Sequence, residues 1–236
     1  MFVISVAQTA GNHRGTRAEQ AYESLKTRLL EGDLDPGDTV SVTALSAQLD
    51  CSRVPVMEAL KRLEGDGFIR IVPQVGCRVV VPPPDQIRDF FTLFARAEAS
   101  VAGFAAARRN QDDLAALDRV WNDLEAQLER ADGPASRDPI YRRLNLMFFG
   151  QIHAIARSPI AAGLAAGMWD RSDFYIKIAF GSLYFSRDVQ ASQRRIRRAI
   201  VEGAVDDAER HVRQFLDTVG ERVAHRLRSN KVAADR

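Results

Sequence analysis

Residues 41–81 constrain the fold of this chain more than any other part of the sequence. The first part, SVTALSAQLDCSRVPVMEALKRLEGDG, has the apolar spacing of two short helices joined by a tight turn. The second part, FIRIVPQVGCRVVV, has two runs of branched residues, which predict strands at 68–72 and 77–81 with a turn between them. Two helices across a tight turn followed by a two-stranded wing predict a winged helix-turn-helix, which places one helix in the DNA major groove.

Local signals support these helices. An earlier helix is predicted over 18–30 from its apolar spacing. Ser41 and Ser52 are candidate N-caps of the two short helices, because a serine hydroxyl accepts a hydrogen bond from the first turn. Pro55 falls in the first turn of the later helix, where its missing N–H needs no partner. Asp50, in the turn, is expected in the left-handed region, which Asp tolerates better than most residues.

Three consecutive prolines at 82–84 divide the chain, because they stiffen the backbone and stop a strand or helix from running through them. We therefore predict a flexible arm at 1–15, a winged helix-turn-helix domain at 16–81, a proline-rich linker at 82–85 and a helical domain at 86–236.

The helical domain makes the predicted fold class mostly α, with a small β wing in the first domain and an all-α bundle of about six helices in the second. Such a bundle is large enough to hold a ligand cavity between its helices. The predicted helices cover 86–109, 112–132, 138–157, 159–180, 187–203 and 205–229.

Composition limits the function classes. The chain contains 46% hydrophobic and 27% charged residues, no apolar run of the ~20 residues that span a bilayer and no convincing signal peptide, so we expect a cytoplasmic protein without a membrane partner. Cys51 and Cys77 form no CxxC pair. No GxSxG, Walker or HExxH sequence is present, so we expect neither an enzyme nor a cofactor.

The exposed side of the helix after Ser52 is the predicted reader of DNA. Arg53 lies at the helix start, where side chains best reach base edges, and Arg is the usual reader of guanine. Val54 and Met57 offer apolar contact, for instance to a thymine methyl group. Lys61 shares this side and Arg62 flanks it, whereas Thr43 and Ser52 suit phosphate oxygens. The other members belong to the wing. The full predicted DNA-binding set is Thr43, Ser52, Arg53, Val54, Met57, Lys61, Arg62, Gln74, Gly76 and Arg78.

Two alternatives stay open on these patterns. Residues 1–80 hold nine Lys and Arg against ten Asp and Glu, a net charge of −1, which also fits a winged domain that binds proteins instead of DNA. The chain could also be an all-helical enzyme with an accessory winged domain. A basic stripe on one side of the winged domain would favour DNA binding.

Several stretches resemble one family of regulators. LLEGDLDPGD, LSAQL, SRVPVMEALKRLEGDGFI and VGCRVV together resemble the N-terminal domain of GntR-type bacterial transcription regulators. FARAEASVAGFAAARR and RRIRRAIVEGAVDDAERHVRQFL resemble the effector domain of the FadR-like branch. The resemblance implies a homodimeric repressor or activator that binds a short palindromic operator in double-stranded DNA. It also implies that a small-molecule effector in the helical domain changes the affinity for DNA.

The chain departs from that branch among its DNA readers. Members commonly carry an Arg where this chain has Met57, and often another where it has Thr43. The loss of two charged readers predicts an altered operator sequence.

The effector domain departs further. Many members bind a divalent metal through one Asp and three His, and this chain has Asn145, Phe149, Gln193 and Phe215 at those positions. The Arg that members often offer to a ligand carboxylate is replaced by Phe94. We therefore predict no metal there. The five residues are predicted to line an effector pocket for a largely apolar or aromatic ligand, with the two amides as hydrogen-bonding groups.

Two alternatives concern this pocket. The phenylalanines could fill the space and leave a solid core. A displaced metal site could use His153 and His211, which lie one helical turn from Phe149 and Phe215.

Overall fold

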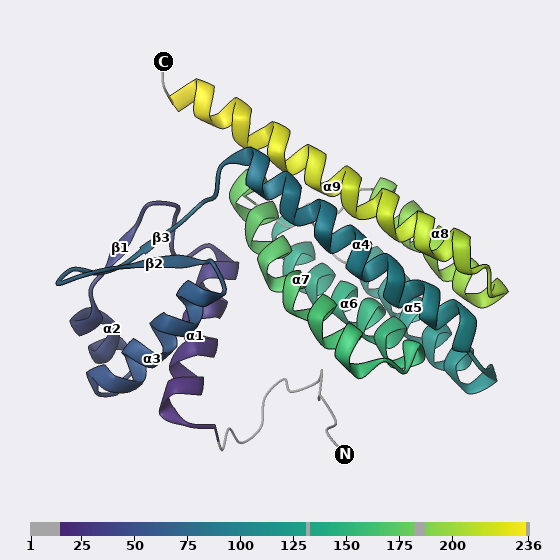
Figure 1. The fold of residues 1–236 in the computed structure, drawn as a ribbon, viewed down its shortest axis with the longest axis horizontal. Coiled ribbons are helices and arrows are strands. Elements are labelled where there is room, and N and C mark those ends of the chain that lie inside the picture. Colours follow the sequence, from purple (N-terminus) through teal and green to yellow (C-terminus); the bar gives the residue numbers. More distant parts are fainter. Residues whose placement is uncertain (1–14, 131–132, 182–186, 235–236) are drawn as a thin grey trace. The chain divides into compact units, whose positions relative to one another are not determined.

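The structure is a computed structural model that describes residues 15–130, 133–181 and 187–234. Apart from Gly15, the predicted arm 1–15 lies outside these residues. The chain forms two compact units, Met1–Pro82 and Pro83–Arg236 (Figure 1).

The first unit contains three helices and a small antiparallel sheet. Its elements are α1 (Arg17–Glu31), β1 (Thr39–Val40), α2 (Val42–Gln48), α3 (Arg53–Gly65), β2 (Ile69–Val72) and β3 (Gly76–Val79). The strand order is β1-β3-β2. The sequence predicts only two strands, and the third is β1, in which Thr39 pairs with Arg78 and Val40 with Cys77. A strand of two residues is too short to show an alternating pattern, so only its pairing with β3 reveals it.

Of the predicted caps and turns of the first unit, the cap at Ser41 and the turn at Asp50 are present. The Ser41 hydroxyl accepts a hydrogen bond from the Ala44 N–H at 3.0 Å, which fixes the start of α2. Asp50 has φ of +46°, so the turn before α3 uses the left-handed region. Ser52 is the N-cap of α3 by position, but its hydroxyl makes no capping hydrogen bond.

One side of α3 forms the centre of the first core. The predicted inward side is buried and packs mainly against α1; its members are Val56, Ala59, Leu60 and Leu63. The facing side of α1 contributes Ala21, Tyr22, Leu25, Leu29 and Leu30. This packing leaves the opposite side of α3 exposed to solvent.

The second unit consists of six helices within the described residues. They are α4 (Pro84–Arg108), α5 (Gln111–Arg130), α6 (Gly133–Ala156), α7 (Pro159–Phe180), α8 (Arg187–Glu202) and α9 (Val205–Ala234). The mostly α fold class, with a winged N-terminal domain and a helical bundle, is therefore confirmed. Helix α4 begins inside the predicted linker, at Pro84, because proline at the first helical position lacks only an N–H that would have no partner.

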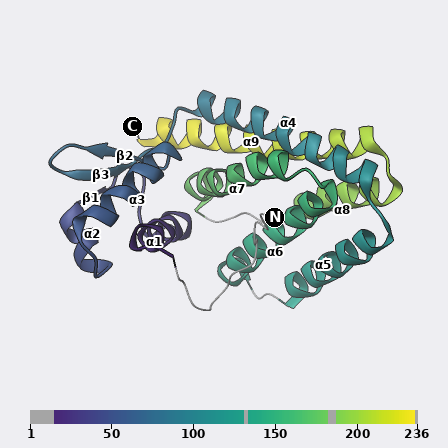
Figure 2. The same cartoon turned by 60° about the horizontal axis from the view of Figure 1, so that its bottom comes forward.

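Helices α4 and α9 form the most extensively packed pair of the bundle and lie side by side along their length (Figures 1 and 2). Gly220 allows this close approach, because a Cβ atom at that position would collide with the side chain of Phe91. By length and composition alone α4 could cross a membrane, but more than half of its apolar segment is buried inside the bundle. It is the core helix of this unit.

Candidate nucleic-acid interface and ligand pocket

The exposed side of α3 presents the side chains that the sequence predicts as base readers. Arg53 and Lys61 are exposed, Val54 is 67% exposed and Met57 is half-buried. Arg53 is the first residue of the helix, so its guanidinium extends from the end that enters a groove in helix-turn-helix proteins. The surface can therefore offer one guanidinium and two apolar groups to base edges.

Arg62 has a different environment. Its guanidinium lies over the ring of Tyr22, 3.8 Å from the centroid, in a cation–π contact. The Tyr22 hydroxyl donates to Asp66 Oδ2 at 2.7 Å, and burial, followed by this bond, raises the pKa of Tyr22. The structure thus places Arg62 against α1, where it joins α1 to the end of α3.

Two hydroxyls of the predicted DNA-binding set lie outside α3. Thr43 on α2 and Ser52 before α3 are both exposed. Since the Ser52 hydroxyl makes no capping hydrogen bond, it and the first N–H groups of α3 are available to a phosphate oxygen.

The wing presents only part of its predicted set. Gln74, at φ of +63°, and Arg78 are exposed, together with Val75 at the turn. Gly76 is buried and is not presented to solvent. Its φ of +144° and its close approach to the Val40 carbonyl leave no room for a Cβ atom. Its role is to hold β3 against β1.

A second arginine stands beside Arg78. Arg70 on β2 pairs directly with Arg78 on β3, and both side chains are exposed. Like charges directly opposite each other destabilise a sheet, so this pair favours a role in binding an anion. Arg70 is absent from the predicted DNA-binding set, although its position between the apolar Ile69 and Ile71 indicates that it lies on the exposed face of the strand.

Charge is divided within the first 80 residues. Residues 51–80 hold five Lys and Arg against three Asp and Glu, a net of +2, whereas residues 1–50 hold four against seven, a net of −3. The total of −1 therefore combines an acidic half with a basic half, and the basic half contains α3, β2 and β3.

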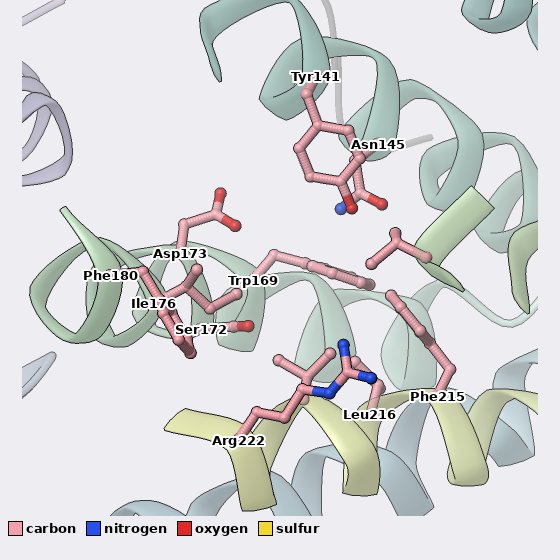
Figure 3. A pocket seen from close by; sticks show the side chains of 12 residues that line it. Tyr141, Asn145, Trp169, Ser172, Asp173, Ile176, Phe180, Phe215, Leu216 and Arg222 are labelled. Carbon is pink, nitrogen blue, oxygen red and sulfur yellow. The ribbon is translucent and has the colours of Figure 1, made fainter. Parts of the chain in front are cut away.

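The second unit encloses a cavity of about 60 Å³ between α6, α7, α8 and α9 (Figure 3). Its walls are mostly aromatic and aliphatic, with a few polar groups. The lining residues are Tyr141, Asn145, Trp169, Ser172, Asp173, Ile176, Phe180, Val189, Phe215, Leu216, Val219 and Arg222.

The five predicted pocket residues divide into two layers. Asn145 and Phe215 lie on the cavity wall. Gln193 lies behind Asn145 and donates from Nε2 to Asn145 Oδ1 at 2.7 Å. Phe94 and Phe149 are fully buried and lie outside the lining, because the Trp169 ring occupies the space that they were expected to face. The centroid of the Trp169 ring is 4.9 Å from that of Phe94 and 4.3 Å from that of Phe149.

A buried carboxylate anchors Trp169. Its Nε1–H donates to Glu98 Oε1 at 2.6 Å, and His153 Nε2 lies 3.0 Å from both oxygens of Glu98. Glu98 is on α4, His153 on α6 and Trp169 on α7, so the cluster joins three helices behind the cavity wall. The sequence gives little sign of it, since the three residues are far apart in the chain.

Asp173 is the acidic group of the cavity. Its Oδ2 accepts from Arg142 Nε at 2.9 Å, and Arg142 also donates to Asp170 at 2.6 Å. Burial raises the pKa of Asp173 to about 7, although the neighbouring Arg142 guanidinium opposes the shift. Burial likewise raises the pKa of Tyr141, with a smaller contribution from Asp173.

The side chains at the family's metal positions do not fit a divalent ion. Two amides and two phenyl rings supply neither a carboxylate nor an imidazole. Within the part of the chain that the structure describes, no three His, Cys, Asp or Glu side chains gather as metal ligands, and His153 is engaged by Glu98.

Most of the cavity wall lies outside the predicted set, because that set contains only the positions that hold metal ligands or the ligand-binding Arg in relatives. Helical spacing was the usable signal. Tyr141 lies four residues before Asn145, and Val219 and Arg222 lie four and seven residues after Phe215, so each falls on the same side of its helix.

Comparison with known proteins now identifies the family. Residues 17–79 match the bacterial regulatory proteins of the gntR family, and residues 91–218 match the FCD domain, which is more than half of the chain. The chain belongs to the GntR family, in the FadR-like branch that carries an FCD domain. It is therefore a helix-turn-helix transcriptional regulator and not an enzyme, as the sequence predicts.

Relatives match this GntR protein at low identity, one over most of its length and another over less than half. An uncharacterised HTH-type transcriptional regulator of Bacillus subtilis, YdhC, is 21% identical over 90% of this chain and 93% of its own. The HTH-type transcriptional repressor GlaR of Escherichia coli is 27% identical over 44% of this chain and 49% of its own.

Solved structures share the fold. Escherichia coli McbR/YncC has a TM-score of 0.70 at 20% identity and covers 86% of this chain and 95% of its own. A GntR regulator from Rhodococcus sp. RHA1 has a TM-score of 0.70 at 18% identity and covers 89% of this chain and 98% of its own.

Proposed function

We propose that this regulator binds a palindromic operator as a homodimer in the cytoplasm and that a small, apolar or aromatic metabolite in the FCD domain changes its affinity for DNA. The observation that supports DNA binding is a winged domain in which both the outer side of α3 and the paired arginines of the wing are exposed. One module makes a small interface, whereas two half-sites one helical turn apart give useful affinity.

The cavity supports the effector part of the proposal. A volume of about 60 Å³ is well below the ~150 Å³ of an apolar protein cavity that admits benzene. An effector of ring size must therefore displace a wall as it enters. That displacement is a physical route to a second arrangement of the bundle, and a ligand shifts the balance only by its differential affinity for the two arrangements.

Dimer formation has a candidate surface on α7. Ile160 is 82% exposed and Leu164 is 68% exposed, and one turn of helix separates them, so they form one patch, the α7 apolar patch. Covering such residues with a second copy of the chain would remove them from water.

Operator binding is the direct test of the proposal. DNA fragments selected from random sequence by the purified protein should contain two related half-sites, and the logarithm of affinity should fall with the logarithm of salt by about 0.9 per phosphate contacted. Arg53→Ala should cost ~1–3 kcal/mol at one base pair of each half-site if Arg53 reads a guanine. A uniform loss across all sequences would make Arg53 a phosphate contact, and failure to select any sequence would refute operator recognition.

A further inference from the structure

Arg222 supplies a positive charge at the edge of the FCD cavity. The side chain rises from α9, and its guanidinium turns toward the centre of the cavity (Figure 3). Its Nη2 lies 3.3 Å from Asp188 Oδ2 on α8, and about half of the Arg222 side chain and most of the Asp188 side chain are exposed. An ion pair this exposed contributes little, so an entering anion can take its place.

Ser172 is a second, independent sign of a ligand. Ser172 lines the cavity and is only 1% exposed, yet its Oγ has no hydrogen-bond partner among the residues that the structure describes. A buried polar atom without a partner is costly, and such atoms are uncommon in folded proteins. A ligand atom in the cavity would satisfy this hydroxyl.

The remaining lining residues indicate the chemical character of the body of the ligand. The rings of Trp169 and Phe215 and the side chains of Ile176, Leu216 and Val219 give the cavity an apolar interior. Trp169 is held in place by its bond to Glu98, so its ring is a fixed surface for a flat or aliphatic group.

The charges of the cavity favour a single negative charge. Asp173 already accepts from Arg142, so it does not call for a cationic ligand. Arg222 already has one acidic neighbour, Asp188, which would repel a doubly charged phosphate more strongly than it would repel a monoanion.

From these observations we infer that the cavity binds a monocarboxylate with an apolar or aromatic body. Its carboxylate would meet the Arg222 guanidinium, its body would lie against Trp169 and Phe215, and Ser172 would bond to a polar atom of the ligand. This inference rests on the proposed effector role of the cavity and names the chemical class of the effector and the residue that selects it.

The test compares acids with their uncharged amides. Benzoate, benzamide, hexanoate and hexanamide are titrated into the purified full chain, with sodium chloride matching the ionic strength, and both calorimetry and the melting temperature are recorded. The acids should bind and raise the melting temperature more than the amides do. Arg222→Gln should weaken binding of the acids ~10-fold or more, because the loss of a hydrogen bond to a charged group lowers affinity by at least that factor. The same change should leave binding of the amides nearly unchanged.

Two further variants keep the test decisive. Arg226→Gln, an exposed arginine one turn along α9 that does not line the cavity, should behave like the wild type. Arg222→Lys, which keeps the charge but loses the planar fork, should retain part of the preference for acids, and it replaces the glutamine variant if that variant fails to fold.

Three outcomes would overturn the inference: equal binding of acids and amides by the wild type, loss of the preference in Arg226→Gln as large as in Arg222→Gln, or no binding of either acid. Operator affinity is measured on the same samples. A neutral ligand that alters operator affinity where the acids do not would leave the proposed function intact and remove only the carboxylate. A wild-type protein that binds no operator would refute the function itself.

Discussion

Asp173 shows how one buried carboxyl group makes stability depend on pH. Burial raises its pKa to about 7 in the folded chain, whereas an Asp in the unfolded chain ionises near 4. Between these values the folded state holds a proton that the unfolded state has released, so this group's contribution to stability falls as pH rises from about 4 to about 7 and is then constant.

Asp173→Asn removes this titration. The free energy of unfolding in urea should fall less for the variant than for the wild type as pH rises from about 4 to about 7, because the variant has no proton to lose at this site. The comparison is between slopes, since loss of the bond to Arg142 shifts the variant's stability at every pH. Parallel curves for the two proteins would show that Asp173 is ionised throughout.

Substitution of Phe149 and of Phe215 should distinguish the buried layer behind Trp169 from the layer that lines the cavity. Phe149 is fully buried behind Trp169, so Phe149→Ala should cost ~3–5 kcal/mol of unfolding free energy, as in a filled core. Phe215 borders the cavity, so Phe215→Ala should cost less stability but alter binding of benzoate. Denaturant unfolding and calorimetry measure both quantities, and equal stability losses would contradict the two-layer arrangement.

At the scale of elements, the sequence predicted most of what local rules control. The inward side of α3, the cap at Ser41 and the left-handed Asp50 follow from spacing and from the conformational preferences of single residues. Strand β1 was missed because its two residues become a strand only by pairing with β3.

Sites assembled from distant residues were harder to predict. Matching family positions found Asn145 and Phe215 on the cavity wall, but it missed Trp169, because the bond that fixes that ring comes from Glu98, 71 residues earlier. Ser172 and Arg222 were missed for a related reason, since their meeting in one cavity depends on how α7 and α9 pack.

The two arginines of the wing should contribute to the salt dependence of operator binding. Arg70→Ala and Arg78→Ala should each weaken operator binding about equally for all sequences and reduce the salt slope by about 1, if each arginine meets a phosphate. Neither change should lower the melting temperature, because each relieves a like-charge pair. Arg17→Ala, an exposed change at the start of α1, is the control. An unchanged salt slope in both wing variants would remove the wing from the interface.

At the scale of the whole molecule, high affinity for a palindromic operator should require dimer formation through the α7 apolar patch. Ile160→Asp combined with Leu164→Asp should turn a dimer into a monomer in sedimentation, because burying two carboxylates in an apolar contact is costly. The monomer should still bind benzoate, since neither residue lines the cavity, but should bind a palindromic operator far more weakly than a dimer that engages both half-sites. Leu93→Asp, an equally drastic change at an exposed position of α4, should leave the dimer intact.

A double variant that remains dimeric would place the subunit contact elsewhere. A monomeric variant with unchanged operator affinity would refute the recognition of two half-sites by two copies of the chain.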